Sequence, residues 1–119
     1  MKDYIKLSNE KAYHLLNSGA LILVSTRDKK GNQNIASIAW QCPVDYDRAT
    51  RLLFICDKDH KTFSNIEETN EFVISLPHIS QVNLVKNLGS VSGKEVNKFT
   101  KFSVPTMADE KIKCLIRLD

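Results

Sequence analysis

Residues 57–62, Asp-Lys-Asp-His-Lys-Thr, form a polar segment between an apolar run and a helical pattern. The run at residues 52–56 is typical of a buried strand, and apolar positions within residues 63–69 recur at helical spacing. The first N–H groups of a helix lack partners within it, and the helix dipole adds partial positive charge there. Because Lys61 adds a charge and Thr62 a hydroxyl at this point, the segment is a candidate phosphate site. A solvated lysine and an ordinary helix-start threonine are the alternative interpretation.

The elements that would position this segment are mainly strands. The expected strands are residues 21–26, 33–41, 51–56, 72–76 and 111–118, and the expected helices are a short one capped by Ser8, residues 60–69, residues 81–87 closed by Gly89, and a helical turn within residues 95–101. The first two strands form a hairpin, because Asp28-Lys29-Lys30-Gly31 is typical of a turn. In its second strand, alternation puts two sets of residues on opposite faces: Ile35, Ser37 and Ala39 on one, and Ala36, Ile38 and Trp40 on the other. Cys42-Pro43 is expected to stop regular pairing, and residues 45–50 to form a polar connector.

This order of elements predicts the fold class. Strands dominate, short helices interrupt them, and the first connection is a hairpin, which favours an antiparallel β-barrel or sandwich with helical insertions over a doubly wound parallel sheet. A chain of 119 residues is expected to form a single domain over residues 1–119. No GxGxxG or GxxxxGK[ST] motif is present, so the usual dinucleotide and P-loop signatures are missing.

Composition excludes several classes of function. The net charge is only +3, and 17 basic residues are scattered among 14 acidic ones, which argues against nucleic-acid binding. Cys42, Cys56 and Cys114 have no metal-ligand or disulfide spacing, and no residue stands out as an acid, base or nucleophile. No apolar stretch has the roughly 20 residues that cross a bilayer, and the start lacks a signal-peptide core. A soluble cytoplasmic protein without a metal, a nucleic-acid partner or a membrane partner is expected.

Three sequence blocks carry a resemblance to a known family. These blocks are Asn34-Ile-Ala-Ser-Ile-Ala-Trp-Gln-Cys-Pro43, residues 60–77 from His60-Lys-Thr-Phe to Ser-Leu-Pro77, and Leu88-Gly-Ser-Val-Ser-Gly-Lys-Glu-Val-Asn-Lys-Phe99. Their order and spacing resemble the flavin reductase-like family, which includes flavoredoxins. The resemblance implies a mainly β fold with short helices, the FMN-binding split β-barrel. It also implies a homodimer with flavin near the subunit interface, and electron transfer from NADH or NADPH to flavin, or onward to a small-molecule acceptor. The family continues beyond the position of residues 111–116, so the barrel is expected to be incomplete at its C-terminal end.

The resemblance also gives the polar segment a ligand. Lys61 and Thr62 are expected to hold the FMN phosphate, and Asp57, Lys58 and His60 to contact phosphate or ribityl hydroxyls, or else to be solvated. For Asp57, a bond to a hydroxyl or to the loop backbone fits better than contact with an anion.

The strand end at residues 37–41 is the second expected cofactor-binding segment. Its members are Ser37, Ile38, Ala39, Trp40 and Gln41. Small side chains would admit a flat ring, and backbone groups left unpaired before Pro43 would address its nitrogen and oxygen atoms. Trp40 is equally suited to core or dimer-interface packing. Ser90, Ser92 and Gly93 either close over the cofactor or form a simple surface turn, which is the favoured interpretation.

No catalytic residue is assigned, because the cofactor carries the redox chemistry in a flavoprotein. The alternative function is a non-catalytic flavin-binding or degenerate dimerisation module of the same fold. A haem-utilisation or pyridoxamine-phosphate-oxidase-like role on a related barrel is a third option.

Overall fold

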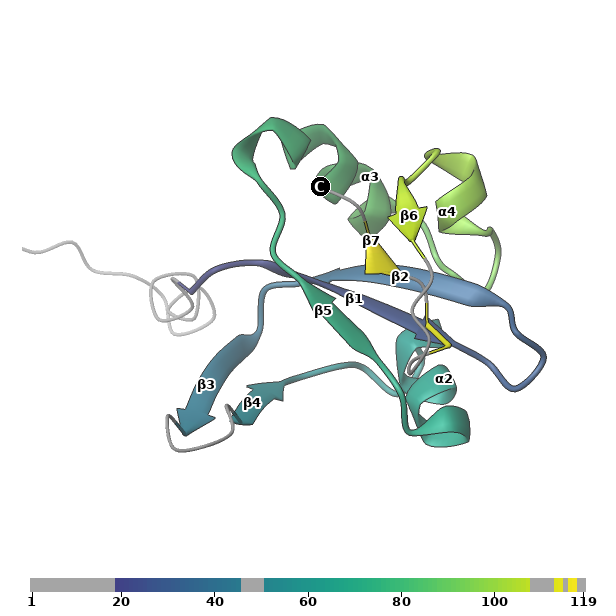
Figure 1. Cartoon of the computed structure of the whole chain (residues 1–119), viewed down its shortest axis with the longest axis horizontal. Coiled ribbons are helices and arrows are strands. Elements are labelled where there is room, and N and C mark those ends of the chain that lie inside the picture. Colours follow the sequence, from purple (N-terminus) through teal and green to yellow (C-terminus); the bar gives the residue numbers. More distant parts are fainter. Residues whose placement is uncertain (1–18, 46–50, 108–112, 115, 118–119) are drawn as a thin grey trace, which may run out of the picture.

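A computed structural model describes residues 19–45, 51–107, 113–114 and 116–117 of the chain. The expected helix that begins at Ser8 lies outside these residues, as does most of the expected connector at residues 45–50. The elements are β1 (Ile22–Arg27), β2 (Gln33–Ile38), β3 (Gln41–Asp45), β4 (Arg51–Phe54), α2 (Lys61–Thr69), β5 (Val73–Ser75), η2 (Ile79–Gln81), α3 (Val82–Ser90), α4 (Lys98–Lys101), β6 (Thr106–Met107) and β7 (Ile116–Arg117). They form a mixed β fold with short helices, as predicted (Figure 1).

The main sheet has three antiparallel strands in the order β2-β1-β5. Its first hairpin is confirmed: Ile22 pairs with Ile38 at one end, and Arg27 pairs with Gln33 next to the turn. Gly31 takes a φ of 92° in that turn, a conformation that favours glycine, and its N–H donates to the Asp28 carbonyl.

A second, two-stranded sheet of β3 and β4 projects from the main sheet (Figure 1). The expected strand over residues 33–41 is therefore interrupted at Ala39 and Trp40, because β2 ends at Ile38 and β3 begins at Gln41. The prediction that Cys42-Pro43 stops regular pairing is wrong at these two residues, since both pair with β4; the register shifts between Pro43 and Asp45. Proline is tolerated where its missing N–H does not face a partner strand, as at the edge of a sheet.

The apolar run at residues 52–56 is not a fully buried strand. β4 alternates between half-buried and exposed residues, and Leu53 and Ile55 are 54% and 60% exposed. Leu52 and Phe54 pack toward the main sheet, whereas the described residues leave the opposite face of the hairpin open. The sequence pattern alone did not distinguish a strand buried on both faces from one buried on a single face.

The helices agree with the predicted positions but differ in length. α2 begins one residue later than expected, and Asn70 ends it in the left-handed conformation with φ of 54°. α3 continues through Gly89 to Ser90, so Gly89 does not close it. α4 is a single turn, β5 is shorter than the predicted strand, and only a two-residue strand, β7, is described within residues 111–118. β6 was not predicted.

Alternate residues of β1 divide the core into two clusters. Leu23 packs with Ile35 and with residues of the C-terminal half, namely Leu88, Phe99 and Val104. Ile22 and Val24 pack with Ile38 on the opposite face of the sheet. α3 and α4 contact β2, and α2 contacts both β1 and β2. The Asn65 side chain of α2 donates to Thr26 Oγ1 of β1 at 3.0 Å. The faces assigned to Ile35 and Ile38 from the sequence are therefore confirmed.

The three sheets formed by the described residues do not close into a barrel. None of the helices within those residues is both long and apolar enough to cross a bilayer.

Candidate functional site

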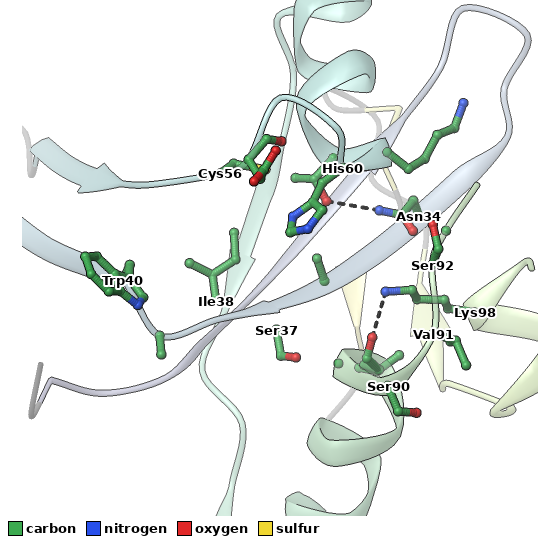
Figure 2. A pocket seen from close by; sticks show the side chains of 18 of the residues that line it. Asn34, Ser37, Ile38, Trp40, Cys56, His60, Ser90, Val91, Ser92 and Lys98 are labelled. Carbon is green, nitrogen blue, oxygen red and sulfur yellow. Dashed lines mark hydrogen bonds between the residues drawn. The ribbon is translucent and has the colours of Figure 1, made fainter. Parts of the chain in front are cut away.

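A cavity of about 450 Å³ lies where β2, the start of α2 and the end of α3 meet (Figure 2). This volume falls within the roughly 300–1,000 Å³ of typical ligand sites. Its lining residues come from four segments: Asn34, Ala36, Ser37, Ile38, Ala39 and Trp40; Ile55, Cys56, Asp57, His60, Lys61 and Thr62; Leu88, Gly89, Ser90, Val91, Ser92 and Gly93; and Lys98.

The cavity brings together eight of the ten cofactor-binding residues expected from the sequence. Gln41 and Lys58 are the two that do not line it. The Gln41 side chain donates instead to the Ala20 carbonyl, and Lys58 is exposed in the turn before α2. The two expected segments, residues 37–41 and 57–62, therefore lie on the same cavity although 15 or more residues separate them in the chain.

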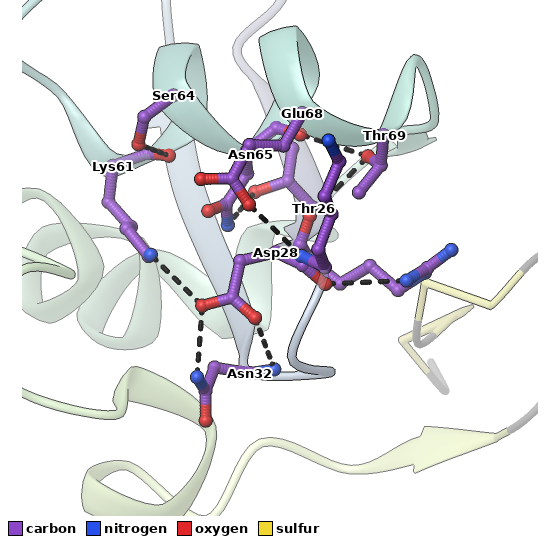
Figure 3. Close-up of polar contacts among 10 residues, drawn as sticks. Thr26, Asp28, Asn32, Lys61, Ser64, Asn65, Glu68 and Thr69 are labelled. Atoms are coloured by element: carbon purple, nitrogen blue, oxygen red, sulfur yellow. Dashed lines mark hydrogen bonds and ion pairs between the residues drawn. The ribbon is translucent and has the colours of Figure 1, made fainter.

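Lys61 at the start of α2 forms an ion pair with Asp28 in the β1–β2 turn (Figure 3). Its Nζ donates to Asp28 Oδ2 at 3.2 Å. The Asn32 side-chain amide and backbone N–H both donate to the same carboxylate at 2.9 Å. The hydrogen bonds from Asn32, aided by Lys61, hold the pKa of Asp28 well below its ordinary value, against burial, which acts in the opposite direction.

Thr62 is buried beneath Asn34, a residue that the sequence interpretation did not select. Asn34 Nδ2 donates to Thr62 Oγ1 at 3.1 Å, and both side chains are at least 97% buried. Asn34 Oδ1 lacks a hydrogen-bond partner among the described residues, although it is buried and Asn34 lines the cavity. Buried polar atoms are rarely left unsatisfied, so this amide is suited to a polar ligand group in the cavity.

Asp57 forms hydrogen bonds with the backbone of its own loop, which is one of the two roles expected for it. Its Oδ1 accepts from Asp59 N at 2.9 Å, and its carbonyl accepts from His60 N at 3.1 Å. Cys56 lies on the cavity wall, where burial raises the pKa of its thiol. A neutral thiol is a poor nucleophile, so Cys56 is not placed in a catalytic role.

The segment after α3 also lines the cavity, contrary to the favoured interpretation of Ser90, Ser92 and Gly93 as a simple surface turn. It approaches β2 closely because Gly93 has no side chain: a Cβ there would lie 2.0 Å from Asn34 Oδ1. Gly89 likewise allows α3 to approach β2, where Ser37 Oγ donates to the Val85 carbonyl at 3.3 Å. The glycine–serine block was the signal in the sequence for this wall.

Lys98 lies in the third sequence block, but the sequence analysis did not select it as a site residue. Its side chain extends from α4 beneath the end of α3, where Nζ donates to the Leu88 carbonyl at 2.6 Å. Lys98 is only 6% exposed, and burial lowers the pKa of its ammonium group. A lysine in a polar segment is usually solvated, so this burial follows from tertiary packing alone.

The opposite part of the cavity is apolar. Ile38, Ala39 and Ile55 line it, and Trp40 is 48% exposed at its margin. The expectation of free backbone groups here is wrong for two carbonyls: Ala39 O accepts from Gln41 N, and Trp40 O accepts from Ile55 N. They are engaged because the chain turns at these residues into the β3–β4 hairpin rather than ending at Pro43.

The cavity therefore combines an apolar wall with a polar end that contains hydroxyl, amide and ammonium groups. A flat, largely apolar ring joined to a polar, anionic tail fits this arrangement, and a flavin mononucleotide has that chemistry. The described residues include no group of three or more His, Cys, Asp and Glu side chains placed to hold a metal ion.

Comparison with known proteins assigns the family. Residues 15–116 match the flavin reductase like domain family. Uncharacterized protein YddH of Escherichia coli (strain K12) is 31% identical over 108 residues, which are 90% of this chain and 57% of YddH.

Solved structures share the fold. An FMN-binding domain of a flavin reductases-like enzyme from Shewanella baltica OS155 has a TM-score of 0.76 and 32% identity, over 93% of this chain and 58% of that one. Flavoredoxin of Desulfovibrio vulgaris (Miyazaki F) has a TM-score of 0.75 and 24% identity, over 82% of this chain and 53% of that one. The chain thus spans little more than half the length of these relatives. The described residues have the mixed β fold with short helices expected from the sequence, which matches the split-barrel structures of this family, and the chain belongs to the flavin reductase like domain family.

Proposed function

We propose that this chain binds FMN in the cavity beside β2 and takes part in electron transfer between NADH or NADPH and flavin, or from flavin to a further acceptor. The observation that carries the proposal is the single cavity shared by an apolar wall and a polar, cationic end, in a chain of this family. Bound FMN would supply the redox chemistry, while the protein binds and orients it.

The residues divide by chemistry. Lys61 and Thr62 stand at the start of α2, where an anionic group is favoured, and belong with the phosphate. Asn34 and His60 offer hydrogen-bonding groups for the hydroxyls of the ribityl chain. The residues assigned to the ring wall are Ser37, Ile38, Ala39 and Trp40. No protein acid, base or nucleophile is assigned, because electron transfer to flavin requires none.

A homodimer belongs to the same proposal. The β3–β4 hairpin carries exposed Val44, Leu53 and Ile55, with Trp40 beside it. A two-stranded hairpin is marginally stable by itself, and clustered exposed apolar side chains mark interaction surfaces. We propose that a second copy of the chain covers this apolar surface.

The three free cysteines fit the proposed cytoplasmic location.

A titration tests the proposal. FMN added to the purified chain should lose fluorescence and change its visible spectrum in a saturable manner. NADH or NADPH should then bleach the bound flavin under anaerobic conditions. Failure to bind FMN would refute the proposal, whereas binding without bleaching by either nucleotide would favour a non-catalytic flavin-binding module.

A further inference from the structure

The 91–97 segment, which connects α3 to α4, lies between two cavities. Val91, Ser92 and Gly93 line the main cavity, and Figure 2 shows Val91 and Ser92 along its side. A second cavity, of about 370 Å³, lies between residues 93–97 and the β1–β2 turn. Because Gly93 lines both cavities, the segment borders empty space on each side of this glycine.

The 91–97 segment has few contacts that hold it against the sheet. None of its residues is buried. Its hydrogen bonds are local: the Ser92 carbonyl accepts from Glu95 N and from Val96 N, both at 3.2 Å, and Asn97 bonds to residues of α4. Within the described part of the chain, no hydrogen bond joins the segment to β1, β2 or α2. Segments with few buried contacts and exposed backbone open at a lower free energy than the whole fold.

The two ends of the segment, by contrast, are fixed. Leu88 near the end of α3 is fully buried, and Phe99 of α4 packs in the same core cluster. Lys98 Nζ donates to the Leu88 carbonyl at 2.6 Å and so joins the two ends. Loops whose ends are held close together form compact surface units, as Ω-loops do. The residues between these ends can therefore move without disturbing the core.

In its observed position, the segment covers a buried acceptor that lacks a partner. Gly93 packs directly on Asn34, since a Cβ at residue 93 would overlap Asn34 Oδ1. Asn34 is 3% exposed, and this oxygen has no hydrogen-bond partner among the described residues. Such an atom costs free energy unless a donor reaches it. Water supplies the donor when the segment moves away, whereas a hydroxyl of a ligand in the main cavity supplies it when the segment stays in place. The balance between the two positions therefore depends on whether the cavity is occupied.

We propose that residues 91–97 form a lid, which swings off Asn34 in part of the free molecules and closes when a ligand hydroxyl donates to Asn34 Oδ1. This inference rests on the proposed function, in which the ribityl chain of FMN supplies that hydroxyl. It adds a gate to the site, because the lid must open for flavin to enter or leave. The second cavity leaves empty space beside Gly93 for this movement. A ligand shifts such an equilibrium only as far as it binds one position better than the other.

Limited proteolysis of the full chain with endoproteinase Glu-C, which cleaves after glutamate, tests the lid. Glu95 is an exposed residue of the segment, whereas Glu67 and Glu68 are exposed residues of α2 and report unfolding of the helix. Mass spectrometry measures the rate of each cleavage with and without saturating FMN, at several urea concentrations below the unfolding transition. Fluorescence titration establishes that FMN is bound.

In the free chain, cleavage after Glu95 should be at least about 10-fold faster than after Glu67 and Glu68. It should also depend less on urea, because opening of the lid exposes little surface. Saturating FMN should slow the cleavage after Glu95 at least about 10-fold. If this cleavage has the same rate and urea dependence as cleavage in α2, the segment opens only with the whole fold and the lid is overturned. Cleavage unchanged by bound FMN would equally overturn the proposal.

Two alanine variants test the contact on which the lid closes. Gly93→Ala disfavours the closed position, whereas Gly19→Ala adds the same methyl group without a short contact. Gly93→Ala should accelerate cleavage after Glu95 in the free chain roughly 5- to 100-fold, the range of an overpacking penalty, and Gly19→Ala should match the wild type. A wild-type rate in Gly93→Ala would overturn Asn34 as the surface on which the lid closes. A wild type that binds no FMN would overturn the proposed function and the ligand coupling with it, although fast cleavage after Glu95 would still identify a segment that opens locally.

Discussion

Gly93→Ala tests directly whether the segment after α3 packs on β2 to form the cavity wall. The added Cβ would lie 2.0 Å from Asn34 Oδ1, 2.7 Å from Asn34 Cγ and 3.2 Å from Lys61 Cβ. The first two distances are shorter than any real Cβ contact. Asn34 cannot simply yield, because it is 3% exposed and bonded to Thr62. Either Asn34 must rotate or the segment must move away from β2.

The expected loss of stability in Gly93→Ala follows from these contacts. Overpacking of this kind costs about 1–3 kcal/mol, and losing the Asn34–Thr62 hydrogen bond adds about 1 kcal/mol. The free energy of unfolding should therefore fall by about 2–4 kcal/mol. For a domain of this size, that corresponds to a decrease of roughly 8–16 °C in Tm.

Urea and thermal unfolding, followed by circular dichroism, measure the effect. Gly19→Ala is the matched control, because a Cβ there meets Gln41 atoms only at 3.6 and 3.7 Å. Asn34→Ala removes the clashing atoms, so the double variant Gly93→Ala/Asn34→Ala should be more stable than the sum of the two single changes predicts. Wild-type stability in Gly93→Ala, or strictly additive costs, would refute the packing of Gly93 on Asn34.

Three further predictions concern charge and assembly. Asp28 has a lowered pKa, so its stabilising contribution is complete well above the unfolded value of 3.8 and is lost progressively as the pH falls below that value toward the lower folded pKa. The free energy of unfolding should therefore drop less between about pH 5 and pH 2 in Asp28→Asn than in the wild type, as urea titrations would show, and an equal drop would contradict this. Lys98 also has a lowered pKa, so its side chain binds more protons in the unfolded chain between the folded value and 10.5. The free energy of unfolding of the wild type should therefore rise with pH across that window relative to that of Lys98→Met, and parallel pH profiles of the two proteins would be evidence against it. Leu53→Asp, at an exposed position of β4, should convert a dimer into monomers in analytical ultracentrifugation, whereas a monomeric wild type or an intact dimer in the variant would disprove the proposed interface.

Much of the fold could be predicted because its signals are local. Turn chemistry at residues 28–31 and the alternating faces of β2 specify the first hairpin. The helical spacing after Lys61 specifies α2. The exposure of Leu53 and Ile55 was not predictable, since an apolar run does not reveal whether other chain segments cover one face or both. The end of β2 at Ile38 was not predictable for a similar reason. The direction in which the β3–β4 hairpin leaves the main sheet depends on tertiary packing, which the local sequence does not show.

The candidate site was predictable where one segment creates it, as at the start of α2. It was not predictable where distant residues meet. The Lys61–Asp28 ion pair joins residues 33 positions apart, and it changes what Lys61 offers a ligand. Asn34 and Lys98 each precede an apolar residue, Ile35 and Phe99, but their own residue types do not predict burial. They become buried cavity residues because α4 and the end of α3 pack against β2.

Flavin binding is the central claim, and equilibrium titration of the purified full chain with FMN tests it most directly. We expect saturable quenching of FMN fluorescence, a matching change in the visible spectrum, and a single FMN per chain at saturation. FMN that keeps its free fluorescence and spectrum in the presence of excess folded protein would contradict the claim.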